Sequence, residues 1–172
     1  METPLVLTII SPDRPGLVDA LSGAIAKNSG NWLESRMCKL GGQFAGILRI
    51  GVAEENKEAL LSDLGKLESK GLKITVESTQ AIVVEEGEET IEMEILGQDR
   101  PGIVSQISAA FAKHNVNVEE LSTGCRSAPM SGEQLFEATA RIRIPSSCEL
   151  SELRGDLEKV AEDLMVDVSF LD

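Results

Sequence analysis

Apolar positions recur along the chain with two different periods. Residues 5–10 form a short run rich in branched apolar side chains, and apolar and acidic residues alternate over 91–95, as in a strand with one buried face. Helical spacing of apolar residues follows each segment directly, over 17–25 and over 103–111. The pattern therefore predicts a strand followed by a helix, once in each half of the chain.

Two further strands are predicted after each of these helices. Residues 28–31 and 114–117 break the helices and open second strands, and the alternation over 44–52 and 136–144 predicts third strands. The third strand of the second half carries Arg141 and Arg143 opposite its apolar row, so we expect both to be exposed or to contact a partner.

A second helix and a closing strand complete each half. Apolar residues at helical spacing mark helices within 60–67 and 153–164, and residues 146–149 have the spacing of a capping box before the latter. Closing strands are predicted at 72–76 and 166–170. The order strand, helix, strand, strand, helix, strand is the ferredoxin-like βαββαβ arrangement, an α+β fold with both helices on one face of an antiparallel sheet.

The two halves are copies of one module. The segment that starts at Ser11 aligns without a gap with the segment that starts at Gly97, at an offset of 86 residues, and the copies share 11 of 22 positions between Asp13 and Glu34. The third strands match at an offset of 94, which predicts about eight extra residues in the second copy, within the polar stretch 124–133.

These observations place a first module at 1–79 and a second at 90–172. They are joined by an acidic linker at 80–89, of which residues 81–84 could extend a strand. Acidic residues in the linker could attract a divalent cation, but their spacing around Gly87 gives no preorganised cage, and we expect no metal site.

The net charge of −13 limits the classes of partner that the protein is expected to bind. An acidic chain repels nucleic acid and anionic membranes, and five aromatic residues without a tyrosine give no platform for base stacking. The second half carries −10 of this charge, so a basic protein partner is expected to bind the second module with salt-sensitive affinity. No apolar run approaches a membrane span, and no signal peptide is apparent, so a cytoplasmic location is expected.

Cysteine and histidine suggest no catalytic or metal chemistry. The three cysteines are odd in number and far apart, so they are expected to be reduced and mostly buried, with no disulfide and no zinc site. The single histidine, His114, ends a predicted helix and suits a dipole partner or a solvated side chain better than a catalytic base. We expect no catalytic residues and no cofactor.

Both modules place Asp-Arg-Pro-Gly, the DRPG turn, between the first strand and the first helix. Proline presets a helical backbone, aspartate can cap the helix start, and glycine allows close approach of another group. A well-formed strand-to-helix turn accounts for most of the motif. Free amides at a helix start also attract a carboxylate, so a ligand site is an equally good interpretation of the residues alone.

The motif resembles the ACT domain, a small-molecule-binding module of amino-acid metabolism. The resemblance rests on DRPGLVxxLSxxIAxxxxNxxE in the first copy and DRPGIVxxISxxFAxxxxNVEEL in the second, and a chain of two such modules resembles the glycine cleavage system transcriptional repressor family. It implies amino-acid binding near the turn. The ligand-binding residues that it nominates are Asp13, Arg14, Gly16, Leu17, Asn31, Asp99, Arg100, Gly102, Ile103 and Asn117.

The roles expected for these residues are physical. The backbone N–H of Gly16 or Gly102 would bind the effector's carboxylate, an aspartate or asparagine would bind its ammonium, and Leu17 or Ile103 would contact its side chain. The two pockets cannot be equivalent, because the first copy has Trp32 where the second has Val118. The longer 124–133 segment could also cover or replace one site.

The leading hypothesis is a non-catalytic regulator that binds a small amino-acid effector and signals through a protein partner. Any role in transcription would then be indirect, and a homodimer is expected. Two alternatives stay open. The modules could form a ligand-free dimerisation scaffold with sheets joined edge to edge. An acylphosphatase-like hydrolase could hold phosphate with Arg14 or Arg100 and position water with Asn31 or Asn117.

Overall fold

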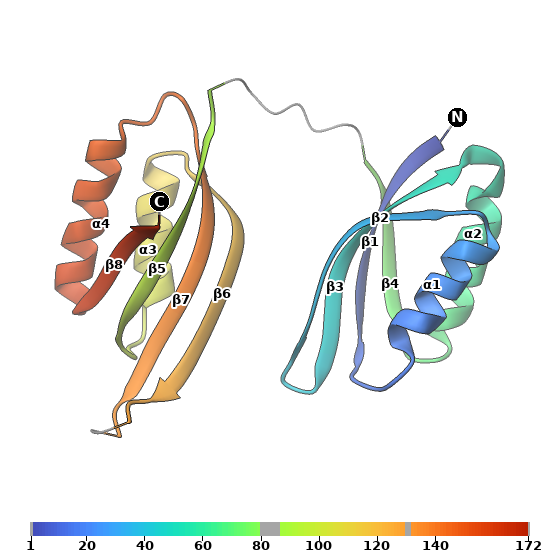
Figure 1. Ribbon diagram of the computed structural model, residues 1–172, viewed down its shortest axis with the longest axis horizontal. Helices are drawn as coiled ribbons and strands as arrows, with labels where there is room; N and C mark the ends of the chain where they lie inside the picture. The colour runs from blue at the N-terminus through green and yellow to red at the C-terminus, as the bar shows by residue number, and fades with distance from the viewer. Residues whose placement is uncertain (1, 80–86, 130–131, 172) are drawn as a thin grey trace. The chain divides into compact units, whose positions relative to one another are not determined.

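The chain forms two compact units, Met1–Ile82 and Val83–Asp172, in the computed structural model shown in Figure 1. The structure describes residues 2–79, 87–129 and 132–171. The strand extension expected at 81–84 lies outside these residues. Strand β5 begins at Glu89, the last residue of the expected linker.

Each unit contains the six expected elements in the expected order. Those of the first unit are β1 (Glu2–Pro12), α1 (Leu17–Lys27), β2 (Asn31–Leu40), β3 (Gln43–Ala53), α2 (Glu54–Glu68) and β4 (Lys73–Ser78). Those of the second are β5 (Glu89–Gln98), α3 (Ile103–Lys113), β6 (Asn117–Ser127), β7 (Gln134–Ile144), α4 (Leu150–Leu164) and β8 (Val166–Leu171).

Within the described residues, each unit has one four-stranded antiparallel sheet with both helices on one face (Figure 1). The strand orders are β2-β3-β1-β4 and β6-β7-β5-β8, so the first strand of each module is central and the second is at an edge. This confirms the prediction of two ferredoxin-like βαββαβ modules. None of the helices in the described part of the chain is long and apolar enough to cross a membrane.

Each unit has its own hydrophobic core between sheet and helices. In the first, Leu5, Leu7 and Ile9 of β1 are buried against Leu21 and other apolar residues of α1 and α2. The corresponding cluster of the second unit is equally buried and includes Met93, Ile107, Phe111, Ile142 and Leu153. Alternation along the strands thus places one row of side chains in the core and leaves the opposite face of each sheet uncovered by helices.

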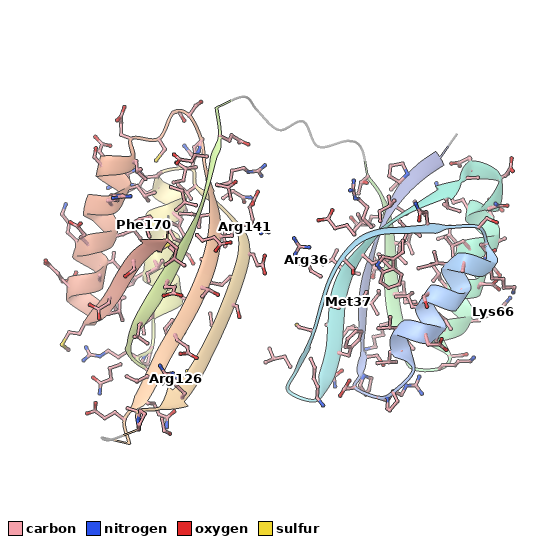
Figure 2. All side chains as sticks on the ribbon, viewed as in Figure 1. Arg36, Met37, Lys66, Arg126, Arg141 and Phe170 are labelled. Atoms are coloured by element: carbon pink, nitrogen blue, oxygen red, sulfur yellow. The ribbon has the colours of Figure 1, made fainter. Side chains whose placement is uncertain are left out.

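The uncovered face of the second sheet carries the two arginines of β7 that were expected there. Both are about one-third exposed or less and form ion pairs: Arg141 with Glu119 and Glu120, and Arg143 with Glu88 and Glu119. Arg141 is labelled in Figure 2. Both arginines are therefore paired with acidic residues of their own unit and are not freely solvated.

The hairpin between the second and third strands differs in length between the units. In the first, Leu40 pairs with Gln43 across a two-residue loop of positive-φ glycines. Trp32 is opposite Ile50, and Val118 is opposite Ile142, so the third strands correspond at an offset of 92. The second unit therefore has six extra residues, and the expectation of eight was wrong. They lie in the segment where the insertion was expected.

Two local expectations were wrong. The capping box at 146–149 does not form, because α4 begins after Glu149 with no side-chain cap hydrogen bond. The cysteines are not mostly buried: Cys38 and Cys125 are exposed, and Cys148 is half-buried. Cys38 and Cys125 lie on the edge strands β2 and β6. An edge strand has a neighbouring strand on one side only, which leaves its residues more exposed.

An aspartate of the second helix joins the two helices of each unit. In the first unit, the Asp63 carboxylate accepts hydrogen bonds from Lys66 (2.6 Å), Lys27 (2.9 Å) and Asn28 (3.1 Å). In the second, Asp156 accepts from Lys113 and lies 2.9 Å from Nε2 of His114. His114 is thus mostly buried against a carboxylate, rather than solvated as one expectation had it.

We expect these aspartates to make stability sensitive to acid. The hydrogen bond from Lys113, and then that from His114, lower the pKa of Asp156 from 3.8 to about 2. A lowered pKa in the folded state means that the stabilisation is present above pH 3.8 and is lost as the pH falls toward 2. Asp156→Asn should lower the free energy of unfolding at neutral pH and flatten its decline between these values.

Urea unfolding from pH 7 to pH 2 measures this dependence. The control is Asp163→Asn, on an exposed acidic residue of the same helix, which should leave the acid dependence of the second unit unchanged. Equal effects of the two substitutions would contradict the assignment. The hydrogen bonds from Lys66, Lys27 and Asn28 also hold the pKa of Asp63 well below its usual range, so the first unit should likewise lose stability as the pH falls below 3.8.

Candidate functional site

The DRPG turns have the same backbone geometry in both units. Gly16 precedes α1 with φ 88° and ψ 3°, and Gly102 precedes α3 with φ 96° and ψ −3°. These left-handed values favour glycine over any residue with a Cβ. Neither helix start has a side-chain cap hydrogen bond, so the expectation that aspartate caps the helix was wrong. The amides of the first turn are not used by a capping side chain.

The backbone of each turn is tied to the third strand or its edge. The N–H of Asp13 donates to the carbonyl of Gly42 at 2.9 Å, and the N–H of Asp99 donates to the carbonyl of Gln134 at 2.8 Å. The motif's aspartate therefore has its main chain fixed against the hairpin between second and third strands. Its carboxylate is placed beside the end of the edge strand.

The two aspartates have different neighbours. In the first unit, the Asp13 carboxylate accepts a hydrogen bond from Nζ of Lys39 on β2, at 2.6 Å. The residue that corresponds to Lys39 on β6 is Cys125. Desolvation, followed by the charge of Asp99 and a hydrogen bond to it, raises the pKa of the Cys125 thiol. Asp13 is thus neutralised by a lysine, whereas Asp99 has a neutral thiol in the same place.

Both arginines of the motif contact the segment that leads into the last strand. The Arg14 guanidinium donates to the carbonyl of Lys70. Arg100 contacts Oε1 of Gln98 at 3.1 Å and Sδ of Met165 at 3.7 Å. These contacts hold the DRPG turn against the end of the second helix. They also occupy the guanidinium groups that the hydrolase alternative assigns to phosphate.

The remaining nominated residues do not all reach the turn. Leu17 and Ile103 are 5% and 2% exposed and belong to the cores, so each offers an effector little more than its edge. Asn31 begins β2 opposite Gly51, which is opposite Pro4 of β1. The turn follows Pro12, which lies eight residues further along β1 than Pro4. At the rise of a strand, about 26 Å therefore separates Asn31 from the turn.

Asn117 occupies the same position in the second unit. It is opposite Arg143, which is opposite Thr90 near the start of β5, whereas the turn follows Gln98. The structure therefore brings Asp, Arg and Gly of each motif together and separates the asparagine from them. Within one module, the asparagine cannot bind the ammonium of an effector held at the turn.

An apolar groove in the second unit was not predicted from the sequence. It lies between α3 and β6 and is lined by Ile103, Val104, Ile107, Val118 and Leu121, with residues of β7 at its base. In the first unit, Trp32 and Met37 of β2 pack against the core at this place (Met37 is labelled in Figure 2). The exchange of Trp32 for Val118 is visible in the sequence, but the place of Leu121 in the groove could be found only from the register of the edge strand.

The described residues contain no group of three or more histidine, cysteine, aspartate or glutamate side chains that could hold a metal ion. A larger hollow of about 390 Å³ lies on the uncovered face of the second sheet, among residues that include Glu94, Ser122, Arg126 and Glu137. Arg126 and Glu137 form an ion pair there at 2.7 Å, and the hollow is a shallow feature of the open sheet.

Comparisons with known proteins agree with this architecture. ACT domain models match residues 3–77 and residues 90–141. A UPF0237 protein of Methanopyrus kandleri is 35% identical over 75 residues, which cover 43% of this chain and 77% of that protein. The glycine cleavage system transcriptional repressor of Escherichia coli is 23% identical over 164 residues, covering 93% of this chain and 85% of the repressor.

Two solved structures match along the whole chain. The structure of an unknown protein from Galdieria sulphuraria has a TM-score of 0.85 and 30% identity, and the match covers 99% of this chain and 98% of that one. A putative glycine cleavage system transcriptional repressor has the same fold, with a TM-score of 0.71, 21% identity and coverage of 99% and 97%. The chain belongs to the ACT-domain family and consists of two ACT modules in tandem.

Proposed function

We propose that this protein is a non-catalytic regulator that binds a small amino-acid effector at a DRPG turn. The observation that carries the proposal is the geometry of the turn: a left-handed glycine begins each first helix, and no side chain caps its amides. Such amides, at the positive end of a helix dipole, favour a carboxylate by about 0.3–1 kcal/mol at an exposed site. The motif's aspartate lies beside the same turn and suits an ammonium group.

The effector-bound surface is recognised by a protein partner. The net charge of −13 disfavours direct contact with nucleic acid, so a role in gene expression is indirect. Sequence similarity over most of the chain to a glycine cleavage system transcriptional repressor supports control of genes of glycine, one-carbon or amino-acid metabolism. We place this activity in a cytoplasmic homodimer.

Isothermal titration of the intact protein with each of the common amino acids tests effector binding. We expect saturable heat with at least one of them, and none with the same compound after N-acetylation, because acetylation removes the ammonium charge. If no amino acid gives heat with the folded protein, glycine and serine included, effector binding is rejected. Light scattering on the same sample measures the oligomeric state.

The scaffold function is the second candidate, and the exposed edges of the sheets favour it. Strand β2 is an edge strand with an exposed Leu40 (79%), and the uncovered face beside it carries Ile47 (54%). Exposed edges and apolar side chains of this kind support association between copies. A dimer whose stability is the same with and without every amino acid tested would favour this candidate over the effector-binding regulator.

A further inference from the structure

The two modules differ at four positions on the helix-facing side of the edge strand. The residues correspond at the offset of 86 that relates the two turns. The pairs are Trp32 and Val118, Ser35 and Leu121, Met37 and Thr123, and Lys39 and Cys125. Each pair is opposite equivalent residues of the third strand, so the four exchanges act on the same strip of surface between the edge strand and the first helix.

In the first unit, this strip is closed. Trp32 and Met37 are partly buried against the core, and the indole Nε1–H of Trp32 donates to Oγ of Ser35 at 3.3 Å. Met37 fits closely over Gly46, where a Cβ would lie 2.5 Å from Cγ of the methionine. At the end of the strip nearest the turn, Lys39 pairs with Asp13. Both the apolar space and the negative charge are therefore already used.

In the second unit, the strip is an open groove. Val118 leaves space where Trp32 lies in the first unit, and Leu121 fills part of that space. The remaining cavity has a volume of about 20 Å³. Its rim is apolar and accessible, since Val104 is 42%, Val118 37% and Leu121 48% exposed. A space of this size accepts about one methyl group, and the rim can cover the rest of a small aliphatic side chain.

The Asp99 carboxylate lies near this groove and contacts Cys125 of the edge strand. Phe136, at the base of the groove, is opposite Cys125 in the strand register, and Cys125 is the side chain that contacts Asp99. Over the parts of the chain that the structure describes, no lysine or arginine forms an ion pair with Asp99. The second unit thus combines an apolar groove with a negative charge, where the first combines a filled strip with an ion pair.

We propose that the second unit carries the effector site and that its effector is an α-amino acid with a branched aliphatic side chain. The Asp99 carboxylate binds the ammonium group, one methyl branch enters the groove between α3 and β6, and the rim residues cover the remaining carbon atoms. The charge of Asp99 selects a cation, and the small hollow selects an aliphatic branch over an aromatic ring. The first unit is closed by Trp32 and by the pairing of Lys39 with Asp13. This inference rests on the proposed function and names its site and its class of effector.

Titration calorimetry with L-valine, L-leucine and L-isoleucine, compared with glycine and L-serine, tests it in the intact chain. Val118→Trp fills the groove as Trp32 does, and Cys125→Lys neutralises Asp99 as Lys39 does Asp13. We expect each substitution to weaken binding of the branched amino acids by about tenfold or more, from loss of apolar contact in one and of a charged hydrogen bond in the other. Both positions lie on the surface strip, and circular dichroism verifies that the variants fold.

Two matched controls make the same exchanges outside the groove. Val18→Trp and Cys38→Lys alter exposed residues of the first unit and should leave binding unchanged. If glycine or serine binds as tightly as the branched amino acids and Val118→Trp has no effect, this inference is overturned while effector binding itself stands. If no amino acid binds the wild-type chain, the proposed function fails as well.

Discussion

Replacing Leu7 by alanine should destabilise the first unit by roughly 2–5 kcal/mol, which is the usual cost of removing a buried leucine side chain. Leu7 lies on the central strand β1 and has no exposed surface, so the helices that cover it cannot fill the cavity without moving. Met93 is its counterpart on β5 and is equally buried. Met93→Ala should destabilise the second unit by a similar amount.

The two substitutions are controls for each other, because the buried residues form two separate clusters. Urea unfolding, followed by amide signals assigned to each unit, should show Leu7→Ala shifting the transition of the first unit alone and Met93→Ala that of the second alone. A common shift of both transitions by either variant would show that the units unfold together, and would contradict independent cores.

Gly102→Ala should destabilise the second unit by about 1–2 kcal/mol, because a residue with a Cβ is strained at φ 96°. The nearest atom to an added Cβ is Nε2 of Gln106 at 3.7 Å, so the cost comes from the backbone conformation and not from a clash. Gly16→Ala should have the same effect on the first unit, since φ is 88° and no atom lies within 4 Å. Thermal unfolding of each variant measures the change.

Gly23→Ala is the matched control for this strain. Gly23 lies inside α1 with space around its Cα, and alanine favours a helix over glycine by roughly 0.5–1 kcal/mol. The control should therefore stabilise the first unit while Gly16→Ala destabilises it. If Gly16→Ala or Gly102→Ala also stabilised its unit, the left-handed conformation at the start of the first helices would be wrong.

The fold was predictable because the strand pattern, the helix pattern and the internal repeat all indicate the same structure. Period-2 alternation in the strands and the apolar stripes of the helices select one buried face, and the 86-residue repeat provides a second copy of the same pattern. The size of the insertion was overestimated, since a strand can be aligned two residues out of register without losing its alternation. Only the pairing of Trp32 with Ile50 and of Val118 with Ile142 fixes the value at six.

The candidate site was predictable only in part. The turn itself could be located from the DRPG motif, but the role of Asp13 could not, because its partner Lys39 is 26 positions away on an edge strand. Asn31 and Asn117 follow the turns closely in sequence. In each unit, however, the first helix lies between the turn and the asparagine and carries the chain back to the other end of the sheet. The groove depends on side chains of α3 and β6 that meet only through tertiary packing.

A branched aliphatic amino acid is expected to bind beside the turn of the second unit. Amide chemical shifts recorded during titration of the intact, isotope-labelled chain with L-leucine report on binding at this site. We expect saturable shifts in residues 99–107 and 118–125, with the corresponding segments 13–21 and 32–39 of the first unit unchanged. Shifts confined to the first unit's turn, or no saturable shift in either unit, would contradict it.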